Sequence, residues 1–295
     1  MTITEPKTVR EAMAGPNAND WHKSMIDELN GIIGSGTLEI VERPANTNVV
    51  SHKWVFKVKY DQDHKVEKFE SRLVARGFTQ RFGVDYTKTF SPVIKQTSIR
   101  IIFTLAAIFG RNVQHLDFPQ AYLNAKLDRP IYMELPEILQ VDTKKHVGLL
   151  LKSLYGLKQS GRLWHEEADV ALTKMGLLRS QLDPCLYHES LDGKLTLYGL
   201  YVDDLLLFSQ NLSRINQKLT QAYNVKDLGG VKKCLGVNVH KIDGGYFLEQ
   251  SNTIEDLLIK HGMSHCRSHS TPIVYDHGYN DAGELSSLTT NELRE

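Results

Sequence analysis

The segment from Leu195 to Ser209, LTLYGLYVDDLLLFS, constrains the fold of this chain more than any other. Two adjacent carboxylates, Asp203 and Asp204, separate two apolar runs whose composition is typical of buried strands. Neighbouring residues in a regular strand face opposite sides, so the segment predicts a hairpin with both carboxylates in its turn. Carboxylates beside apolar surface are costly unless a cation meets them, and hard divalent ions prefer carboxylate oxygens. A solvent-exposed Asp-Asp turn in an ordinary hairpin is the alternative.

A third carboxylate, Asp117, stands near the end of a strand predicted over residues 113–118, where Pro119 stops the ladder. Residues 121–123 then predict a tight turn or the start of a helix. Three carboxylates at strand ends suit the two divalent ions of phosphoryl transfer on nucleic acid. Asp117 and Asp203 are the preferred direct ligands, and Asp204 is the third. The alternative role for Asp117 is that of a helix cap.

Two basic segments flank these acids. Residues 49–60 and 66–74 predict a two-stranded ribbon, and from His52 to Arg81 there are eight Lys or Arg against four acids. Residues 143–165 hold five Lys or Arg and no acid, with a glycine turn followed by a helix. Basic residues mixed with Tyr155 and Trp164 fit phosphate neutralisation with base stacking. The alternatives are a lysine-rich edge ribbon and a helix whose aromatic residues lie in the core.

The remaining pattern predicts an α+β chain, with an ordered loop over residues 77–93 and a second hairpin that turns at 243–245. Helices are expected from Asn19-Asp20 to Gly34, from Ser91 or Pro92 to Ile108, over 211–224, and from an Asn252 cap to His261.

Composition restricts the class of protein. The 295 residues have a formal net charge of zero, so any contact with nucleic acid must use a local patch. The three cysteines lack CxxC pairing, which favours a reducing compartment. The N-terminus has no apolar signal-peptide core, and no apolar run is long enough to span a bilayer. We therefore expect a cytosolic or nuclear protein that is not secreted and has no membrane partner.

Seven segments, in order, resemble the reverse transcriptase domain of copia-type (Pseudoviridae) LTR-retrotransposon polyproteins. The resemblance covers the chain from about Trp21 to Pro272. The segments are KWVFKVKY (53–60), SRLVARGFTQRFGVDYTKTFSPV (71–93), LDFPQAYLNAKLDRPIYMELPE (116–137), LKSLYGLKQSGRLW (151–164), YVDDLLLFS (201–209), KDLGGVKKCLGVNV (226–239) and STP (270–272).

The resemblance implies a right-hand polymerase, with an antiparallel palm sheet packed on helices. Fingers and palm would occupy about 21–225 and a partial, thumb-like remainder about 226–272, between a polar segment (1–20) and a polar tail (273–295). It also implies DNA synthesis from dNTPs on a primed RNA or DNA template with two Mg²⁺ ions, for which Mn²⁺ can substitute. The parent element would add integrase and RNase H, and the enzyme would work in a cytoplasmic virus-like particle or in the nucleus.

Residue by residue, the resemblance assigns three sets of roles. The catalytic and metal-binding residues would be Asp117, Asp203 and Asp204. Tyr122 would block a ribose 2′-OH, and the other nucleotide-binding residues would be Lys57, Arg72, Arg76 and Gln159. The residues that bind nucleic acid would be Lys158, Arg162 and Tyr201.

The sequence departs from the family pattern at three places. Phe118-Pro119 stands where the family usually has Val and a polar residue, Ala125 replaces Gly, and Gly161 replaces Pro or Ala. Protease, integrase and RNase H segments are absent from the chain. Two hypotheses follow: an active RNA-directed DNA polymerase, or a truncated, catalytically inactive relic that retains nucleic-acid binding.

Overall fold

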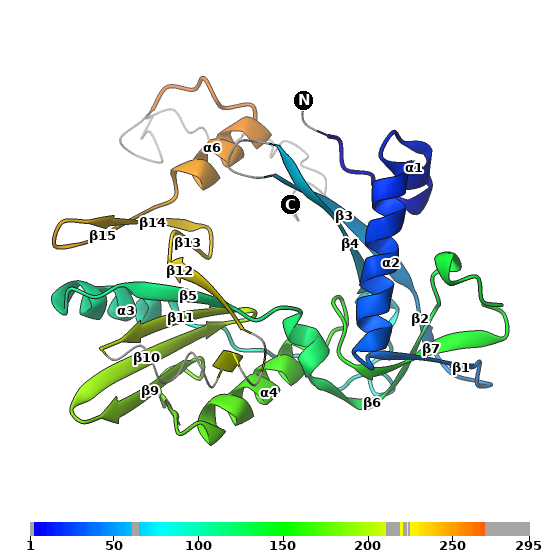
Figure 1. Ribbon diagram of the computed structural model, residues 1–295, viewed down its shortest axis with the longest axis horizontal. Helices are drawn as coiled ribbons and strands as arrows, with labels where there is room; N and C mark the ends of the chain where they lie inside the picture. Colours follow the sequence, from blue (N-terminus) through cyan, green and yellow to red (C-terminus); the bar gives the residue numbers. More distant parts are fainter. Residues whose placement is uncertain (1–2, 61–64, 211–218, 221–222, 224, 269–295) are drawn as a thin grey trace, which may run out of the picture. The chain divides into compact units, whose positions relative to one another are not determined.

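The computed structural model describes residues 3–60, 65–210, 219–220, 223 and 225–268. The chain divides into two compact units, Met1–Leu248 and Glu249–Glu295. Helices and several sheets alternate along the chain, which confirms the α+β class (Figure 1). The α-helices of the described part are α1 (Val9–Ala14), α2 (Ala18–Gly34), α3 (Gln96–Ile108), α4 (Ser160–Lys174) and α6 (Ser251–Lys260). Short 3₁₀ helices are η1 (Gly77–Thr79), η2 (Ala121–Asn124) and η3 (Glu137–Leu139).

The predicted basic ribbon is formed by β3 (His52–Tyr60) and β4 (Val66–Ala75), which pair antiparallel. Trp54, Phe56 and Val58 are buried, whereas the lysines between and beside them are exposed. This alternation follows from the two-residue period of a strand. The ribbon's apolar face packs on α2, which runs beside it in Figure 1.

Helix α2 also satisfies the free edge of β4. The Ser71 N–H donates to Ser24 Oγ at 2.7 Å, and the Leu73 N–H donates to the Glu28 carboxylate at 3.2 Å. Unpaired edge groups would otherwise be open to another strand. Helix α2 therefore covers the apolar face of the ribbon and accepts hydrogen bonds from N–H groups on the free edge of β4.

A four-stranded sheet extends the same apolar core. Its order is β1-β7-β6-β2, with β1 (Leu38–Glu42), β7 (His146–Lys152), β6 (Lys126–Met133) and β2 (Val49–Val50). The β2–β6 pair is parallel, and the other pairs are antiparallel.

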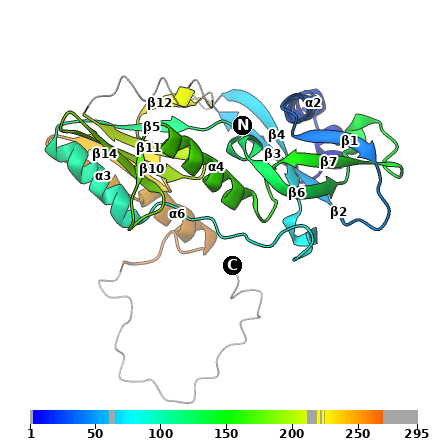
Figure 2. The ribbon, with the colours of Figure 1, turned by 90° about the horizontal axis from the view of Figure 1, so that it is seen from below.

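The acidic segments lie in an antiparallel six-stranded sheet of order β12-β5-β11-β10-β9-β8. Helices pack on both faces: Gly199 of β10 lies against Ile94 and Ile102 of the α3 region, and Tyr187 of β9 donates to Asp169 of α4 at 2.8 Å. The strands are β5 (Val113–Asp117), β8 (Leu178–Arg179), β9 (Leu186–Leu191), β10 (Lys194–Tyr201), β11 (Asp204–Ser209) and β12 (Lys226–Gly230). Figure 2 shows α4 alongside β10 and β11.

The second predicted hairpin belongs to a three-stranded sheet of β13 (Lys233–Cys234), β14 (Val237–Ile242) and β15 (Gly245–Glu249). The single strand expected over 232–241 is interrupted at Leu235 and Gly236, which have φ of +52° and +75°. The Tyr246 hydroxyl accepts the Val113 N–H at 3.3 Å and donates to the Arg111 carbonyl at 2.8 Å. These bonds tie this sheet to the start of β5.

Three predicted helix starts are wrong. Helix α3 begins at Gln96, because the Asp183 carboxylate accepts the Lys95 N–H and the Ser98 hydroxyl at 2.9 and 2.5 Å and so caps it from a distant segment. Helix α2 begins at Ala18, one residue before the expected Asn-Asp pair. In the second unit, α6 begins at Ser251, so Asn252 lies inside its first turn.

The polar segment 1–20 contains α1, whose first turn is capped by Thr8 Oγ1 accepting the Glu11 N–H at 3.2 Å. The predicted helix over 211–224 lies largely outside the described residues, and the STP motif and the tail lie wholly outside them. Among the described helices, none is both long and apolar enough to cross a membrane.

Candidate active site

The turn between β10 and β11 carries Asp203. Tyr201 ends β10 and pairs with Asp204, the first residue of β11, so the turn consists of Val202 and Asp203. The predicted hairpin is confirmed, but the placement of both carboxylates in the turn is wrong for Asp204. A two-residue loop is the tightest common hairpin connection, and here it leaves Asp204 in the ladder.

Asp117 lies directly opposite Asp204 on β11, and Lys226 of β12 lies opposite Asp117 on its other side. Directly opposed residues of antiparallel strands project from the same face. Tyr201, Asp204, Asp117 and Lys226 therefore form a row across four strands. Asp117 is not a helix cap, since Gln120 holds the N-cap position of the following η2.

The end of β5 is tied to the turn by the main chain. The Phe118 N–H donates to the Asp203 carbonyl at 2.8 Å. Pro119 comes one residue after Phe118, so the N–H that proline lacks is not the one that makes this bond. The departure from the family pattern at Phe118-Pro119 thus leaves Asp117 and Asp203 on neighbouring segments.

Burial raises the pKa of the Asp203 carboxyl, and the charges of Asp204 and Asp117 raise it further, whereas its own N–H and Arg72 lower it. The carboxylates therefore repel one another at the turn. Asp204 Oδ1 accepts a hydrogen bond from His115 Nε2 at 2.7 Å, and this bond is the main reason why the pKa of His115 is raised. His115 lies two residues before Asp117 on the same face, and no sequence motif pointed to it.

Within the described residues, no group of three or more His, Cys, Asp or Glu side chains is gathered closely enough to hold a metal ion. The donor set nevertheless fits a hard divalent cation. Asp117 and Asp203 both line one hollow, and neither has an ion pair with a described cation. Carboxylate oxygens of this kind are ligands that Mg²⁺ accepts beside its waters.

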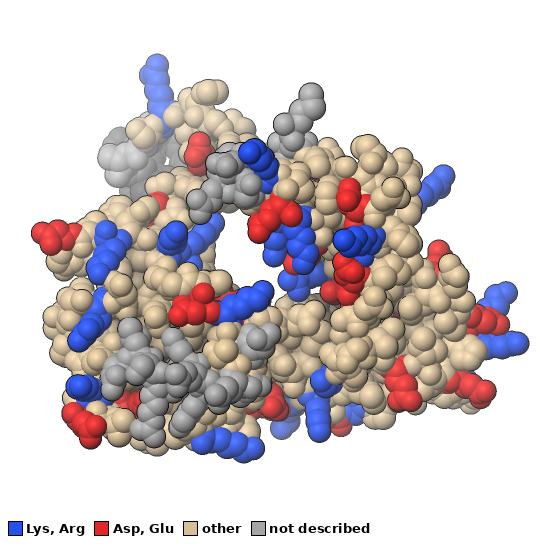
Figure 3. Space-filling model, viewed as in Figure 1, with Lys and Arg blue, Asp and Glu red and all other residues tan. Residues whose placement is uncertain are grey.

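This hollow, of about 420 Å³, lies between the ribbon, α2 and the acidic end of the six-stranded sheet. Figure 3 shows basic and acidic side chains mixed along its rim on the ribbon side. Besides the two aspartates, its charged and aromatic lining residues are Asp27, Glu28, Lys59, Lys68, Phe69, Glu70, Arg72, Phe118, Tyr155 and Lys226.

Arg72 and Tyr155 line this hollow, and Tyr122 packs against Tyr155. The Tyr122 and Tyr155 rings meet edge to face with centroids 4.6 Å apart, and the Arg72 guanidinium lies 5.1 Å from the Tyr155 ring centroid. Asp203 is close enough to Tyr122 to contribute to its raised pKa, of which burial is the main cause. The structure thus brings predicted residues Arg72 and Tyr122 to the carboxylates.

Tyr155 is a residue of the hollow that the sequence assigned only to general base stacking. Its place is fixed by the next residue, Gly156, which has φ of +91° and approaches the end of β4 so closely that no Cβ would fit. The glycine that directly follows Tyr155 in the sequence was the signal that could have predicted this close approach to β4.

The structure does not bring Gln159 to the hollow. Its side chain is fully buried, accepts from Gln80 Nε2 at 3.0 Å and donates to the Asp85 carbonyl at 2.8 Å. It joins the loop after β4 to the start of α4. The neighbouring Lys158 is exposed and holds its ammonium 5.6 Å from the centroid of the Tyr86 ring.

Three other predicted cations also lie apart from the carboxylates. Lys57 pairs with Glu5 at 3.0 Å. Arg162 is only 13% exposed and pairs with Asp128 and Glu166 at 2.5 and 2.9 Å, which occupies its guanidinium.

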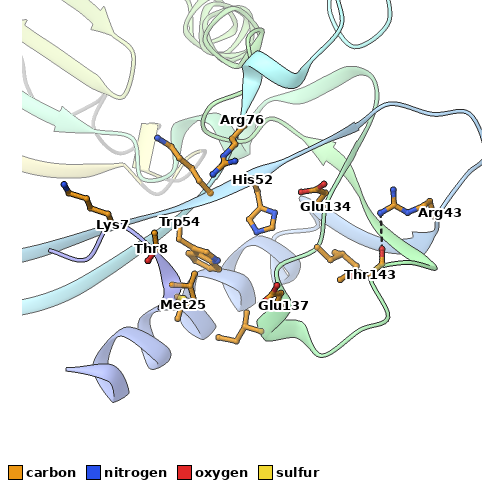
Figure 4. Close-up of a pocket in the computed structure, with 14 residues that line it drawn as sticks. Lys7, Thr8, Met25, Arg43, His52, Trp54, Arg76, Glu134, Glu137 and Thr143 are labelled. Carbon is orange, nitrogen blue, oxygen red and sulfur yellow. Dashed lines mark hydrogen bonds between the residues drawn. The ribbon is translucent and has the colours of Figure 1, made fainter. Parts of the chain in front are cut away.

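The third of these cations, Arg76, lines a separate cavity of about 520 Å³ with His52, Trp54 and Glu134 (Figure 4). Trp164, which the sequence offered for base stacking or for the core, is 1% exposed and belongs to the core.

Comparison with known proteins shows the family to which the chain belongs. The family model for reverse transcriptase (RNA-dependent DNA polymerase) matches residues 35–275. The chain is 36% identical over 276 residues to the retrovirus-related Pol polyprotein from transposon TNT 1-94 of Nicotiana tabacum. This match covers 91% of this chain and 21% of that protein. It is 34% identical over 276 residues to the Pol polyprotein from transposon RE1 of Arabidopsis thaliana, covering 92% of this chain and 19% of that protein.

A yeast relative, the transposon Ty1-BL Gag-Pol polyprotein of Saccharomyces cerevisiae, is 32% identical over 182 residues, or 60% of this chain and 10% of that protein. The chain thus spans about a fifth or less of the length of these relatives. The resemblance inferred from the motifs is confirmed, and the chain belongs to the reverse transcriptase family of copia- and Ty1-type retrotransposon Pol polyproteins.

Proposed function

We propose that this chain is an RNA-directed DNA polymerase domain that transfers nucleotides from dNTPs to a primer 3′-OH. The observation that carries the proposal is the register of β5 and β11, which sets Asp117 opposite Asp204 and beside the turn residue Asp203. Asp117 and Asp203, from two segments far apart in sequence, share one hollow with Arg72 and Tyr155, and Tyr122 packs against Tyr155. Nucleotidyl transfer needs this combination of placed carboxylates and cations.

In a right-hand description, the ribbon and the four-stranded sheet would be the fingers, and the six-stranded sheet with α3 and α4 would be the palm. The three-stranded sheet would begin the thumb-like part, within the expected boundaries of about 21–225 and 226–272. Its bonds to the start of β5 would hold it beside the palm sheet.

The three acids and Arg72 have distinct roles in this proposal. Asp117 and Asp203 would supply the carboxylates that hold Mg²⁺, and Asp204, oriented by His115, would be the third acid. When bound, two such ions activate the attacking hydroxyl and stabilise the leaving oxygen. Arg72 would meet the triphosphate of the incoming dNTP.

The two tyrosines would select the sugar of the incoming nucleotide. The Tyr122 ring is held edge to face by Tyr155, so it would present a fixed wall to the ribose 2′-OH. The proposal transfers the neighbouring nucleotide-pocket role of Gln159 to Tyr155, because Gln159 is buried in a structural contact.

The template and primer would lie along the exposed basic groups. Lys158 is exposed, and Tyr201 stands in the row of carboxylates. Lys59, Lys68 and Lys226 line the hollow and add positive charge for phosphates. In the parent element, integrase and RNase H parts would accompany this domain.

Primer extension on poly(rA)/oligo(dT) with Mg²⁺ and dTTP tests the proposal. The double variant Asp203→Asn, Asp204→Asn should lose activity by on the order of 100-fold or more, since metal-assisted charge stabilisation is worth several kcal/mol. Asp192→Asn is a matched control, because Asp192 is an exposed turn residue at the other end of β10. Extension by the double variant at the wild-type rate would refute the assignment.

One observation favours the alternative, a nucleic-acid-binding relic without catalysis: the described acids form no group of three close enough for a metal. That alternative predicts that wild-type protein binds the primed template but does not extend it. The same assay with a binding measurement on the labelled duplex decides between the two.

A further inference from the structure

The turn that carries Asp203 contains an unusual backbone conformation. Val202 has φ of +50°, whereas Asp203 does not have a positive φ. A two-residue hairpin turn with a positive φ at its first position favours glycine, and a β-branched residue is strained there. The turn therefore needs contacts that hold it.

Helix α4 supplies one such contact. Trp164 Nε1–H donates to the Val202 carbonyl at 2.5 Å. The indole is 1% exposed and is itself fixed by Phe118, whose ring centroid lies 5.2 Å away in an edge-to-face contact, and by Tyr223 at 6.2 Å. Rotation of this indole away from the carbonyl would open a void beside the Phe118 and Tyr223 rings, so the donor is held in place by packing.

The bond acts on the peptide plane that joins Val202 to Asp203. The Val202 carbonyl and the Asp203 N–H belong to that one plane, and this N–H is close enough to the Asp203 carboxyl to lower its pKa. On the other side of Asp203, the Phe118 N–H holds the next carbonyl at 2.8 Å. Both peptide planes that flank Asp203 are thus fixed by donors from outside the hairpin.

We propose that Trp164 is a positioning residue for the polymerase site: its indole N–H holds the Val202 carbonyl and thereby sets the direction of the Asp203 carboxylate toward the hollow. The inference rests on the proposed function, because the direction of the Asp203 carboxylate affects catalysis only if the hollow is the polymerase site. It differs from the family-derived roles, because Trp164 is 1% exposed and does not line the hollow.

The test removes the donor and keeps the ring. Trp164→Phe lacks the N–H but retains an aromatic side chain against Phe118. Trp21→Phe is the matched control, since Trp21 is also buried, at 3% exposure, and packs edge to face on Phe56 and Phe69 of the ribbon. Both variants lose similar volume, so a general packing defect should affect them alike.

The readouts are Mn²⁺ affinity, measured by electron paramagnetic resonance of the free ion, and steady-state primer extension. Trp164→Phe should weaken Mn²⁺ binding and lower kcat by about three- to tenfold, the range expected for one hydrogen bond, with KM for the primed template unchanged. Trp21→Phe should leave all three quantities at wild-type values. If Trp164→Phe does not fold, the benzothienyl isostere of Trp164, in which sulfur replaces N–H, makes the same test.

Mn²⁺ affinity and kcat that are equal in the two tryptophan variants would overturn the positioning role while leaving the polymerase assignment intact. Wild-type protein that neither binds Mn²⁺ nor extends a primer would overturn the proposed function, and the positioning role with it.

Discussion

Replacement of Gly156 by alanine should destabilise the protein more than any other single-methyl addition at its described glycines. Gly156 has φ of +91°, and a Cβ there would lie 2.0 Å from the Ala75 carbonyl oxygen and 2.7 Å from Val74 Cγ1. The oxygen belongs to the end of β4, where the Ala75 N–H donates to the Tyr155 carbonyl at 2.8 Å. The clash therefore cannot be relieved without moving the contact that places Tyr155 at the hollow.

Two costs contribute. A positive φ costs an alanine about 1–2 kcal/mol relative to glycine, and overpacking a tight site typically costs about 1–3 kcal/mol. Gly156→Ala should thus lower the free energy of unfolding by about 2–5 kcal/mol. For a domain of this size the fall in Tm should be at least about 5 °C.

Two other glycines separate these costs. Gly176 has φ of +97°, and an added Cβ would meet no atom within 4 Å, so Gly176→Ala carries only the conformational cost. Gly77 has no positive φ, but its Cβ would lie 2.3 Å from the Gly156 carbonyl oxygen, so Gly77→Ala carries only the cost of crowding. Thermal and urea unfolding of the three variants measure the order. If the Gly156→Ala variant is as stable as the Gly176→Ala variant or more stable, the close packing of the turn on β4 is refuted.

Three further predictions concern other sites. Burial raises the pKa of Glu28 above its ordinary value of 4.5. The stabilising effect of this group is therefore full below pH 4.5 and is lost as the pH rises through the higher folded-state pKa. Glu28→Gln should flatten the decline of the unfolding free energy over that window, and an unchanged decline in urea titrations at several pH values would contradict this. Burial raises the pKa of the Cys185 and Cys234 thiols to about 12, so at pH 8 native protein should react with a thiol reagent at the exposed Cys266 and slowly or not at all at the other two, with peptide mapping as the check. Tyr122→Val should raise the incorporation of ribonucleotides relative to deoxynucleotides several-fold in primer extension, and an unchanged ratio would remove Tyr122 from the sugar-selecting wall.

Elements whose signals are local could be predicted from the sequence. The hairpin around Asp203, the strand before Asp117 and the basic ribbon each carry a strand period with a turn at its end, and the structure has all three. Strand β12 (Lys226–Gly230) was missed, because KDLGG has two glycines and no alternation and owes its pairing to β5. Here the neighbouring strand, and not the segment itself, decides the conformation.

Side-chain roles were harder to predict, because they depend on partners that are remote in sequence. Arg162 is paired with Asp128, 34 residues away, and Gln159 with Gln80, 79 residues away. Both were assigned to ligand binding from their motif, yet their hydrogen-bonding groups are already occupied by protein. A polar residue in a family motif can therefore serve a loop contact and not a substrate contact, and only the tertiary structure separates the two.

The main chain explains why an unusual residue beside Asp117 is compatible with the site. Proline at position 119 cannot donate, and in the middle of a ladder it would remove a bond. The β5 ladder, however, makes its last contact with the turn through the Phe118 N–H, one residue earlier. The Phe118 side chain is 2% exposed and packs on Trp164, so the same residue links the strand end, the Asp203 carbonyl and the helix that holds the Val202 carbonyl. Because this junction depends on Phe118 and Trp164, its geometry tolerates Pro119, and the position where a substitution should separate Asp117 from Asp203 is Phe118.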